Sequence, residues 1–264
     1  MTTKKIQKRV MKMTSDDRRV MSGFPSLDRI TGGFRPGSLN VIAGSPGRGK
    51  TGLALNIAHN AAVKYNKQVL VISLELSKEE LANRVLSFVS EGSPDTAKDL
   101  VYIDDRFGSF EEVQVNLRED IEKVHPDLII IDYLQLLVLL EENNKRGIAK
   151  VTSFLMRLAA DYEVPVIVLS QLNRDLEHDS DKSTLRGLEE CKCGPVVQDA
   201  DVIVFLRWED YGSHREDQVF DAHLDVAKNR FGDRDLTATV KWERAKFKFY
   251  EEQIRKAVEE EKDT

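Results

Sequence analysis

Short apolar runs recur along the chain, and most of them are continuous and do not alternate with polar residues. Strands buried on both faces of a parallel sheet have this pattern, because helices cover both faces of such a sheet. The runs predict strands at residues 39–43, 69–74, 101–104, 128–132, 166–170 and 202–206. Later runs predict antiparallel strands added at one edge of the sheet, at residues 223–228, 236–242 and 247–250.

Segments with apolar residues at helical spacing lie between these runs. They predict helices at residues 51–65, 77–89 and 148–162. Ser77 opens the second of these segments, and Glu80 follows three residues later, which is the pattern of a capping box. The alternation of the two kinds of segment predicts an α/β fold with a mostly parallel, twisted sheet flanked by helices.

The chain shows no internal repeat and no clear linker, so one main domain is predicted at residues 21–250. Residues 1–20 form a basic N-terminal arm with apolar residues spaced by four and three at Ile6, Val10 and Met13. The arm is interpreted as a short linker helix that docks on another surface, or as a solvated tail. Residues 251–264 are a charged C-terminal tail.

Composition limits the class of protein. Hydrophobic residues make up 41% of the chain and charged residues 32%, which is typical of a soluble globular protein. The longest apolar run, around residues 134–140, is too short for a membrane span, which needs roughly 18 residues. The basic N-terminus lacks a signal-peptide core, so a cytoplasmic protein is expected, with a mitochondrial transit peptide as the alternative.

Charge and cysteine content narrow the candidate chemistry. The net charge of −6 argues against a nucleic-acid binder that uses its whole surface, so any contact with nucleic acid must use a local patch. Cys191 and Cys193 are separated by one residue, and no histidine lies at a standard zinc-ligand spacing from them. They are interpreted as two reduced cysteines in a loop.

One motif carries the chemistry of a nucleoside triphosphatase. It matches G-x-x-x-x-G-K-[ST] and consists of Gly44, Ser45, Pro46, Gly47, Arg48, Gly49, Lys50 and Thr51. A predicted strand precedes it and a predicted helix follows, so backbone N–H groups and the helix N-terminus can cradle phosphates. We expect Lys50 to reach the β and γ phosphates of ATP, and the Thr51 hydroxyl to ligate Mg²⁺.

Polar residues at the ends of other predicted strands supply candidate partners for this motif. Asp132 follows four apolar residues and is expected to hold Mg²⁺; the alternative is a strand-end cap. Glu75 ends the strand after the motif's helix and is the candidate general base, or else an acid favoured near a helix start. Gln171 is the candidate sensor of the γ phosphate, or a plain loop glutamine.

Together, several segments resemble the C-terminal motor domain of DnaB-type replicative helicases. These are SGFPSLD from Ser22, GSPGRGKT from Gly44, SLELS from Ser73, IDYLQL from Ile131, SQLNR from Ser170 and QDADV from Gln198. The resemblance spans residues 21–250. The segment AKNRFG from Ala227 also resembles the mitochondrial and phage primase-helicase branch.

The resemblance implies a RecA-like P-loop fold assembled as a ring, usually of six subunits. ATP then lies between neighbours, single-stranded DNA runs through the centre, and DNA is unwound 5′–3′ during replication. Glu75 matches the catalytic glutamate. Lys228 and Arg230 match a pair inserted into the next subunit's site, with Arg230 as the arginine finger. The residue pattern agrees with such a pair, because side chains two positions apart at a strand end point the same way. The alternative interpretation of Lys228 and Arg230 is a solvated basic turn.

In that family two loops line the DNA channel, and a further arginine follows the glutamine strand. The matching cations here are Lys145, Arg146, Arg174, Arg186 and Lys192. Such residues would contact backbone phosphates without sequence preference. The second loop, at residues 179–197, is longer and more acidic than the family's segment.

Only about 20 residues precede the main domain, whereas replicative helicases carry an N-terminal collar. A primase, a helicase loader or a separate collar domain is therefore an expected partner, and a bacterial or phage protein is favoured over an organellar one. Two other functions remain open: a RecA/RadA-like recombination or repair ATPase, and a DnaB-like regulatory ATPase without unwinding activity.

Overall fold

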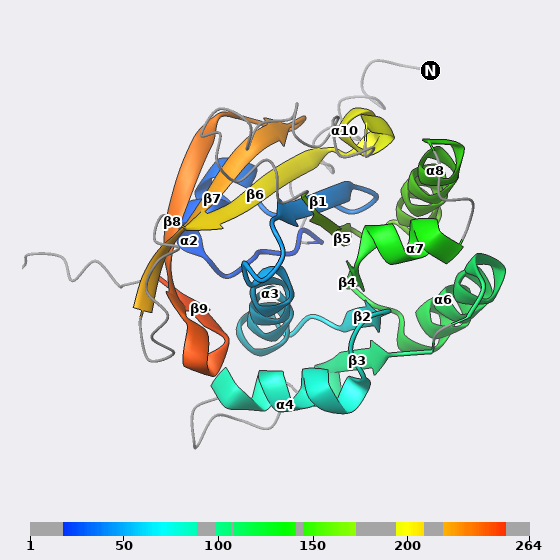
Figure 1. Ribbon diagram of the computed structural model, residues 1–264, viewed down its shortest axis with the longest axis horizontal. Coiled ribbons are helices and arrows are strands. Elements are labelled where there is room, and N and C mark those ends of the chain that lie inside the picture. The colour runs from blue at the N-terminus through cyan, green and yellow to red at the C-terminus, as the bar shows by residue number, and fades with distance from the viewer. Residues whose placement is uncertain are drawn as a thin grey trace, which may run out of the picture.

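One twisted sheet organises the molecule (Figure 1). The computed structural model describes residues 18–88, 99–106, 108–140, 145–172, 194–208 and 219–251. Within these residues the sheet has nine strands in the order β3-β2-β4-β5-β1-β6-β7-β8-β9. Their bounds are β1 (Leu39–Gly44), β2 (Val69–Ser73), β3 (Val101–Asp104), β4 (Leu128–Asp132), β5 (Val166–Gln171), β6 (Val202–Trp208), β7 (Val219–Asn229), β8 (Leu236–Glu243) and β9 (Lys248–Tyr250).

The pairing of the strands confirms the predicted fold class. Neighbouring strands from β3 to β6 pair in parallel, whereas β7, β8 and β9 continue the sheet in antiparallel order. Parallel strands need crossover connections, and helices supply most of them. The antiparallel edge agrees with the expectation from the later apolar runs.

Helices cover both faces of the sheet (Figure 1). One layer contains α2 (Pro25–Thr31), α3 (Lys50–Tyr65) and α4 (Lys78–Phe88). The opposite layer contains α6 (Phe110–Val124), α7 (Leu134–Leu140), α8 (Lys145–Tyr162) and α10 (Gly194–Asp199). A short 3₁₀ helix, η3 (Arg244–Lys246), joins β8 to β9.

The two layers explain why the strand sequences are continuously apolar. All six residues of β1 are buried. Val41 and Ala43 pack in the core on the α6–α8 side, whereas Ile42 between them packs against the α3 side. A strand between two cores therefore needs apolar side chains on both faces.

One predicted strand is longer in the structure, and four helices had not been predicted. The strand expected at residues 223–228 runs over Val219–Asn229, because its pairing with β6 and β8 extends beyond the apolar stretch. The helices α2, α6, α7 and α10 were not predicted. For α6 a local signal exists: Ser109 and Glu112 form a capping box in which both reciprocal hydrogen bonds are present.

The predicted capping box at Ser77 is confirmed. The backbone N–H of Glu80 donates to Ser77 Oγ at 3.3 Å, and the backbone N–H of Ser77 donates to the Glu80 carboxylate at 3.0 Å. The apolar positions of the N-terminal arm at residues 6–13, and the whole tail after Glu251, lie outside the described residues. The division at residues 20 and 250 therefore stays a prediction.

Candidate active site

A cavity of about 540 Å³ opens at the carboxyl ends of the parallel strands. In open α/β sheets this edge is the usual place for a ligand. The residues predicted for nucleotide chemistry line the cavity together, although they come from four separate segments of the chain: Lys50, Thr51, Glu75, Asp132 and Gln171. The structure thus assembles these five sequence-predicted residues in one place.

The loop between β1 and α3 needs its glycines. Gly47 and Gly49 have φ angles of 73° and 89°, in the left-handed region that L side chains rarely adopt, and Gly49 caps the N-terminus of α3. Gly44 has a different constraint, because an added Cβ would lie 2.8 Å from the carbonyl oxygen of Leu206. The loop therefore curls at the positive end of a 16-residue helix, which suits an anion.

Lys50 lies at the first position of α3 with its side chain folded over the loop. Its Nζ donates to the carbonyl oxygen of Ser45 at 2.9 Å. Burial lowers the pKa of Lys50 to about 8, and the nearby carboxylates of Asp132 and Glu75 partly oppose that shift. A buried cation of this kind is most stable when an anion approaches it.

Thr51 and Asp132 form a direct pair at the base of the cavity. The Thr51 hydroxyl donates to Asp132 Oδ2 at 2.7 Å. Burial raises the pKa of Asp132 to about 6; the Thr51 hydrogen bond lowers it, while the charge of Glu75 raises it. A cation beside this carboxylate would offset its loss of hydration.

The donor set of this pair fits Mg²⁺. A hydroxyl and a carboxylate are hard oxygen ligands, and Mg²⁺ prefers few protein ligands together with substrate phosphates and water. Among the described residues no cluster of three or more histidine, cysteine or acidic side chains offers a protein-only cage. Thr51 and Asp132 would therefore hold the ion jointly with the phosphates of the nucleotide.

Glu75 lies in a tight turn that follows β2. Ser73 Oγ accepts the backbone N–H of Leu76 at 3.1 Å and donates to its carbonyl oxygen at 2.6 Å, which closes the turn around Glu75. The backbone N–H of Leu74 donates to the carbonyl oxygen of Asp132 at 2.9 Å. Glu75 is exposed at the cavity, where a water molecule can reach its carboxylate.

Gln171 ends β5 beside the start of the phosphate loop. The strand register pairs it with Gly44, and the next residue, Leu172, donates its N–H to the carbonyl oxygen of Gly44 at 3.1 Å. Its backbone is also held by the side chain of Gln135 on α7. Gln171 thus touches the phosphate loop and a separate helix, as a sensor requires.

The outer wall of the cavity is formed by residues that the sequence does not single out. Arg84 from α4 lies over the ring of Phe247 at 4.9 Å, and Arg244 and Trp242 line the same side. Trp242 stacks on Phe249 at 4.1 Å and packs against the glycines at the start of α3. No local sequence signal marks these residues, because they approach the phosphate loop only when β8 and β9 fold against α3.

Lys228 and Arg230 lie next to the amino ends of the parallel strands, opposite the carboxyl ends where the cavity opens. Strand β7 runs antiparallel to β6, so Asn229 pairs with Val202, and Val202 in turn pairs with Asn40 near the start of β1. The phosphate loop begins at the opposite end of β1, roughly 17 Å away for a six-residue strand. The structure therefore does not bring these two cations to the cavity of their own chain.

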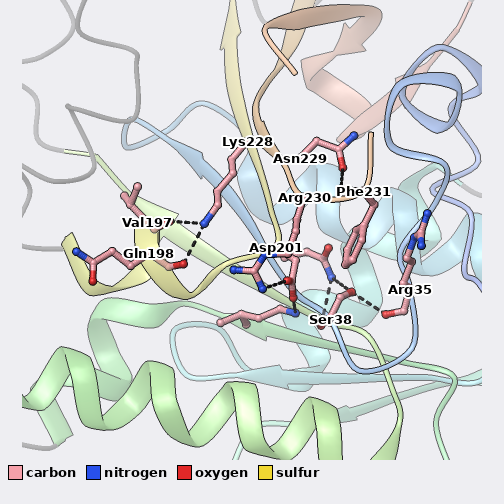
Figure 2. Close-up of polar contacts among 11 residues, drawn as sticks. Arg35, Ser38, Val197, Gln198, Asp201, Lys228, Asn229, Arg230 and Phe231 are labelled. Carbon is pink, nitrogen blue, oxygen red and sulfur yellow. Dashed lines mark hydrogen bonds and ion pairs between the residues drawn. The ribbon is translucent and has the colours of Figure 1, made fainter. Parts of the chain in front are cut away.

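Both cations are held by partners near α10 (Figure 2). Lys228 Nζ donates to the carbonyl oxygens of Val197 and Gln198, at 2.7 Å and 3.0 Å. Burial and the nearby Arg230 lower the pKa of Lys228. Arg230 Nη1 donates to Asp201 Oδ1 at 2.6 Å.

The pair lies at the very end of β7. Strand β7 ends at Asn229, so Arg230 lies one residue beyond it. A register irregularity also occurs opposite Ile203 and Val204 of β6. The two side chains have different hydrogen-bond partners, and the charge of Arg230 acts on Lys228, so the two cations lie close together.

The predicted DNA contacts fall mostly outside the described residues. Arg146 is exposed in the first turn of α8, whose first residue is Lys145; the side chain of Lys145 is not described. Arg174, Arg186 and Lys192, together with Cys191 and Cys193, also lie outside the described residues. Among the helices that are described, none is long and apolar enough to cross a membrane.

Comparison with known proteins identifies relatives of this arrangement. The model of the DnaB-like helicase C-terminal domain matches residues 19–97 and 89–251. The replicative DNA helicase DnaB of Geobacillus stearothermophilus is 32% identical over 240 residues, covering 81% of this chain and 52% of the relative. That of Pasteurella multocida (strain Pm70) is 35% identical over 244 residues, covering 81% and 51%. The chain thus spans about half the length of these curated relatives.

Two solved structures are similar to this chain along nearly its whole length. One solved ATPase domain superposes with a TM-score of 0.77 at 28% identity, covering 95% of this chain and 98% of that domain. A DnaB-like replicative helicase, solved in a study of its interactions with primase, superposes with a TM-score of 0.76 at 27% identity, covering 96% and 69%.

Proposed function

Because this chain belongs to the family of DnaB-like helicase C-terminal domains, we propose that it is the ATP-driven motor of a replicative DNA helicase. Its subunits form a ring, ATP is hydrolysed between neighbouring subunits, and the ring moves along single-stranded DNA. The family and the relatives named above support this function over a recombination ATPase or a regulatory ATPase.

The division of charged residues between two edges of the sheet is the observation that carries the proposal. Lys50, Thr51 and Asp132 lie at the carboxyl edge, whereas Lys228 and Arg230 lie at the amino edge, a strand length away. A phosphoryl-transfer site needs cations that offset the negative charge of its transition state. Arg230 can serve that purpose only at the site of another subunit, which requires an assembly.

Within one subunit, each cavity residue has a distinct task. Lys50 neutralises charge on the β and γ phosphates, and the loop N–H groups bind the phosphate oxygens. Glu75 orients and polarises the attacking water. Thr51 and Asp132 would hold Mg²⁺, which would supply electrostatic stabilisation of the phosphates. Gln171 detects the γ phosphate and transmits its loss to α7 through Gln135.

The remaining assignments concern the assembly and its partners. A ring of six subunits is proposed, with 5′–3′ movement and with Lys145, Arg146, Arg174, Arg186 and Lys192 on the DNA. A primase, a loader or a collar domain is the expected protein partner, and the cytoplasm of a bacterium or of a phage-infected cell is the expected location.

The test measures ATPase activity with and without single-stranded DNA, and displacement of a strand annealed to substrates with a 5′ or a 3′ tail. We expect stimulation by DNA and displacement from the 5′-tailed substrate. Lys50→Ala should abolish both, because the charge at the phosphates is lost. Lys64→Ala is the matched control on the same helix, since Lys64 Nζ bonds the carbonyl oxygen of Gly23 far from the phosphates.

Each other outcome contradicts part of the proposal. Stimulation without displacement would favour the recombination or repair ATPase. An ATPase rate that does not change when single-stranded DNA is added would favour the regulatory ATPase. Hydrolysis at the wild-type rate in Lys50→Ala would refute the assignment of the phosphate cradle itself.

A further inference from the structure

Each carboxylate oxygen of Asp201 accepts a hydrogen bond from a different partner (Figure 2). Oδ2 accepts the backbone N–H of Leu39, the first residue of β1, at 3.0 Å. Oδ1 accepts Nη1 of Arg230 at 2.6 Å. Backbone hydrogen bonds join the same three residues. The N–H of Asp201 donates to the carbonyl oxygen of Leu39 at 2.7 Å, and the N–H of Arg230 donates to the carbonyl oxygen of Asp201 at 2.9 Å.

The two partners differ in exposure. The side chain of Asp201 is 13% exposed, whereas that of Arg230 is 52% exposed. A carboxylate at this depth needs its hydrogen bonds, so it keeps the guanidinium in place. Among the described residues Asp201 is the side-chain partner of Arg230, and the bond occupies one of the five N–H donors of the guanidinium. The exposed edge retains donors in a fixed plane.

The residues beside Arg230 are also fixed. Asn229 Nδ2 donates to the carbonyl oxygens of Ile30 and Asp233, at 3.1 Å and 2.9 Å, and its Oδ1 accepts the N–H of Phe231 at 3.1 Å. The guanidinium of Arg35 lies 4.4 Å from the centre of the Phe231 ring. The backbone on both sides of Arg230 is therefore anchored, and the carboxylate of Asp201 orients its long side chain.

We infer that Asp201 is a positioning residue for Arg230: it holds one edge of the guanidinium so that the other edge is presented, already oriented, to the phosphates bound by a neighbouring subunit. This inference rests on the proposed function, in which Arg230 acts on a neighbour's ATP. An arginine that is oriented before it meets the phosphates loses less conformational freedom in the transition state.

Asp201→Asn tests the inference, because the amide oxygen can still accept the Leu39 N–H while the negative charge that Asp201 presents to Arg230 is lost. We expect kcat for ATP to fall about tenfold, with KM and nucleotide affinity unchanged within about twofold, since the subunit's own cavity is untouched. Asp225→Asn is the matched control: Asp225 on β7 pairs with Arg207 on β6, and neither residue lines the cavity. Its kcat should equal that of the wild-type chain.

Mixing experiments distinguish positioning from a general structural role. Asp201→Asn subunits keep Glu75, and Glu75→Ala subunits keep an oriented Arg230, so their mixture should recover activity above the sum of the separate rates. A mixture of Asp201→Asn with Arg230→Ala should recover none, because every interface lacks an oriented arginine. Recovery in that second mixture, or wild-type kcat in Asp201→Asn, would overturn the inference.

Two further measurements keep the test decisive. Should Asp201→Asn fold poorly, Arg230→Lys serves in its place: an ammonium held by Asp201 has no second edge, so kcat should fall as far as in Arg230→Ala. Retention of more than half of wild-type kcat by Arg230→Lys would contradict oriented presentation. The mixture of Arg230→Ala with Glu75→Ala tests the proposed function separately, since absence of recovery there rejects action between subunits altogether.

Discussion

The side chain of Gln135 binds the backbone of Gln171 on both sides. Its Oε1 accepts the N–H of Gln171 at 3.1 Å, and its Nε2 donates to the carbonyl oxygen of Gln171 at 2.9 Å and to the hydroxyl of Ser170 at 3.1 Å. The end of β5, next to the phosphate loop, is thereby tied to α7. A shift of Gln171 at the nucleotide and a shift of α7 are then mechanically connected.

Gln135→Met should weaken this connection, because the side chain keeps its length but loses the hydrogen bonds to Ser170 and Gln171. We expect the free energy of unfolding to fall by about 1–3 kcal/mol and stimulation of the ATPase by DNA to be reduced. Denaturant unfolding and ATPase assays with and without single-stranded DNA measure the two effects. Gln114→Met on α6 is the control, and equal DNA stimulation in both variants would argue against the connection.

Thr51→Val should raise the requirement for Mg²⁺. Valine has the shape of threonine but cannot donate to Asp132 or offer an oxygen to the ion. We expect the Mg²⁺ concentration for half-maximal ATPase activity to rise at least about tenfold, while Thr51→Ser stays close to wild type. The measurement is the hydrolysis rate against Mg²⁺ at fixed ATP, and superimposable curves for threonine and valine would remove Thr51 from the metal site.

Lys50 should take up a proton when nucleotide binds above pH 8. Burial lowers its pKa to about 8 in the ligand-free protein, so part of the population is neutral at about pH 8.5, and phosphate charge restores the ammonium. Calorimetry in buffers of different ionisation enthalpy measures this uptake. Lys50→Arg should show none, because arginine stays protonated; the same uptake in this variant would assign the proton to another group.

The same shift predicts how stability changes with pH. The folded pKa of Lys50 lies below its ordinary value of 10.5, so the folded state disfavours the proton. The resulting stabilisation is present above the unfolded pKa and is lost as the pH falls towards 8. Unfolding of the ligand-free chain should therefore show a gain between pH 8 and 10.5 relative to Lys50→Met, which titrates in neither state.

Gly52→Ala should destabilise the protein although alanine favours helices by about 1 kcal/mol. A Cβ at this position would lie 3.1 Å from Cη2 of Trp242, in a stacked pair with Phe249 that cannot easily move. We expect a loss of about 1–2 kcal/mol in the free energy of unfolding, recovered when Trp242→Phe is added. Additive losses in the double variant would show that the two residues do not collide.

Local sequence signals identified the nucleotide half of the site. The phosphate loop is contiguous, and its strand–loop–helix context can be read within about 30 residues. Asp132 ends an apolar strand and Glu75 follows one closely, and parallel strands bring their carboxyl ends together, so the convergence of these two residues follows from the fold class alone. The pairing of Thr51 with Asp132, 81 positions apart, is a consequence of that rule.

Helix α7 has no local sequence signal that predicts it. The seven residues of α7 are almost entirely apolar, so they lack the polar face that marks a helix on a surface. The sequence of α7 does not reveal that Gln135 reaches across to β5, because a hydrogen bond between distant segments leaves no periodic pattern.

The amino-acid sequence is sufficient to show which residues can bind and hydrolyse a nucleoside triphosphate, since that chemistry needs particular residue types at fixed short spacings. The place of the two cations at the end of β7, in contrast, became clear only from the three-dimensional fold. Because β7 turns back antiparallel to β6, Arg230 comes to rest on Asp201 at the edge away from the phosphate loop of its own chain. That position depends on the pairing and direction of strands distant in sequence.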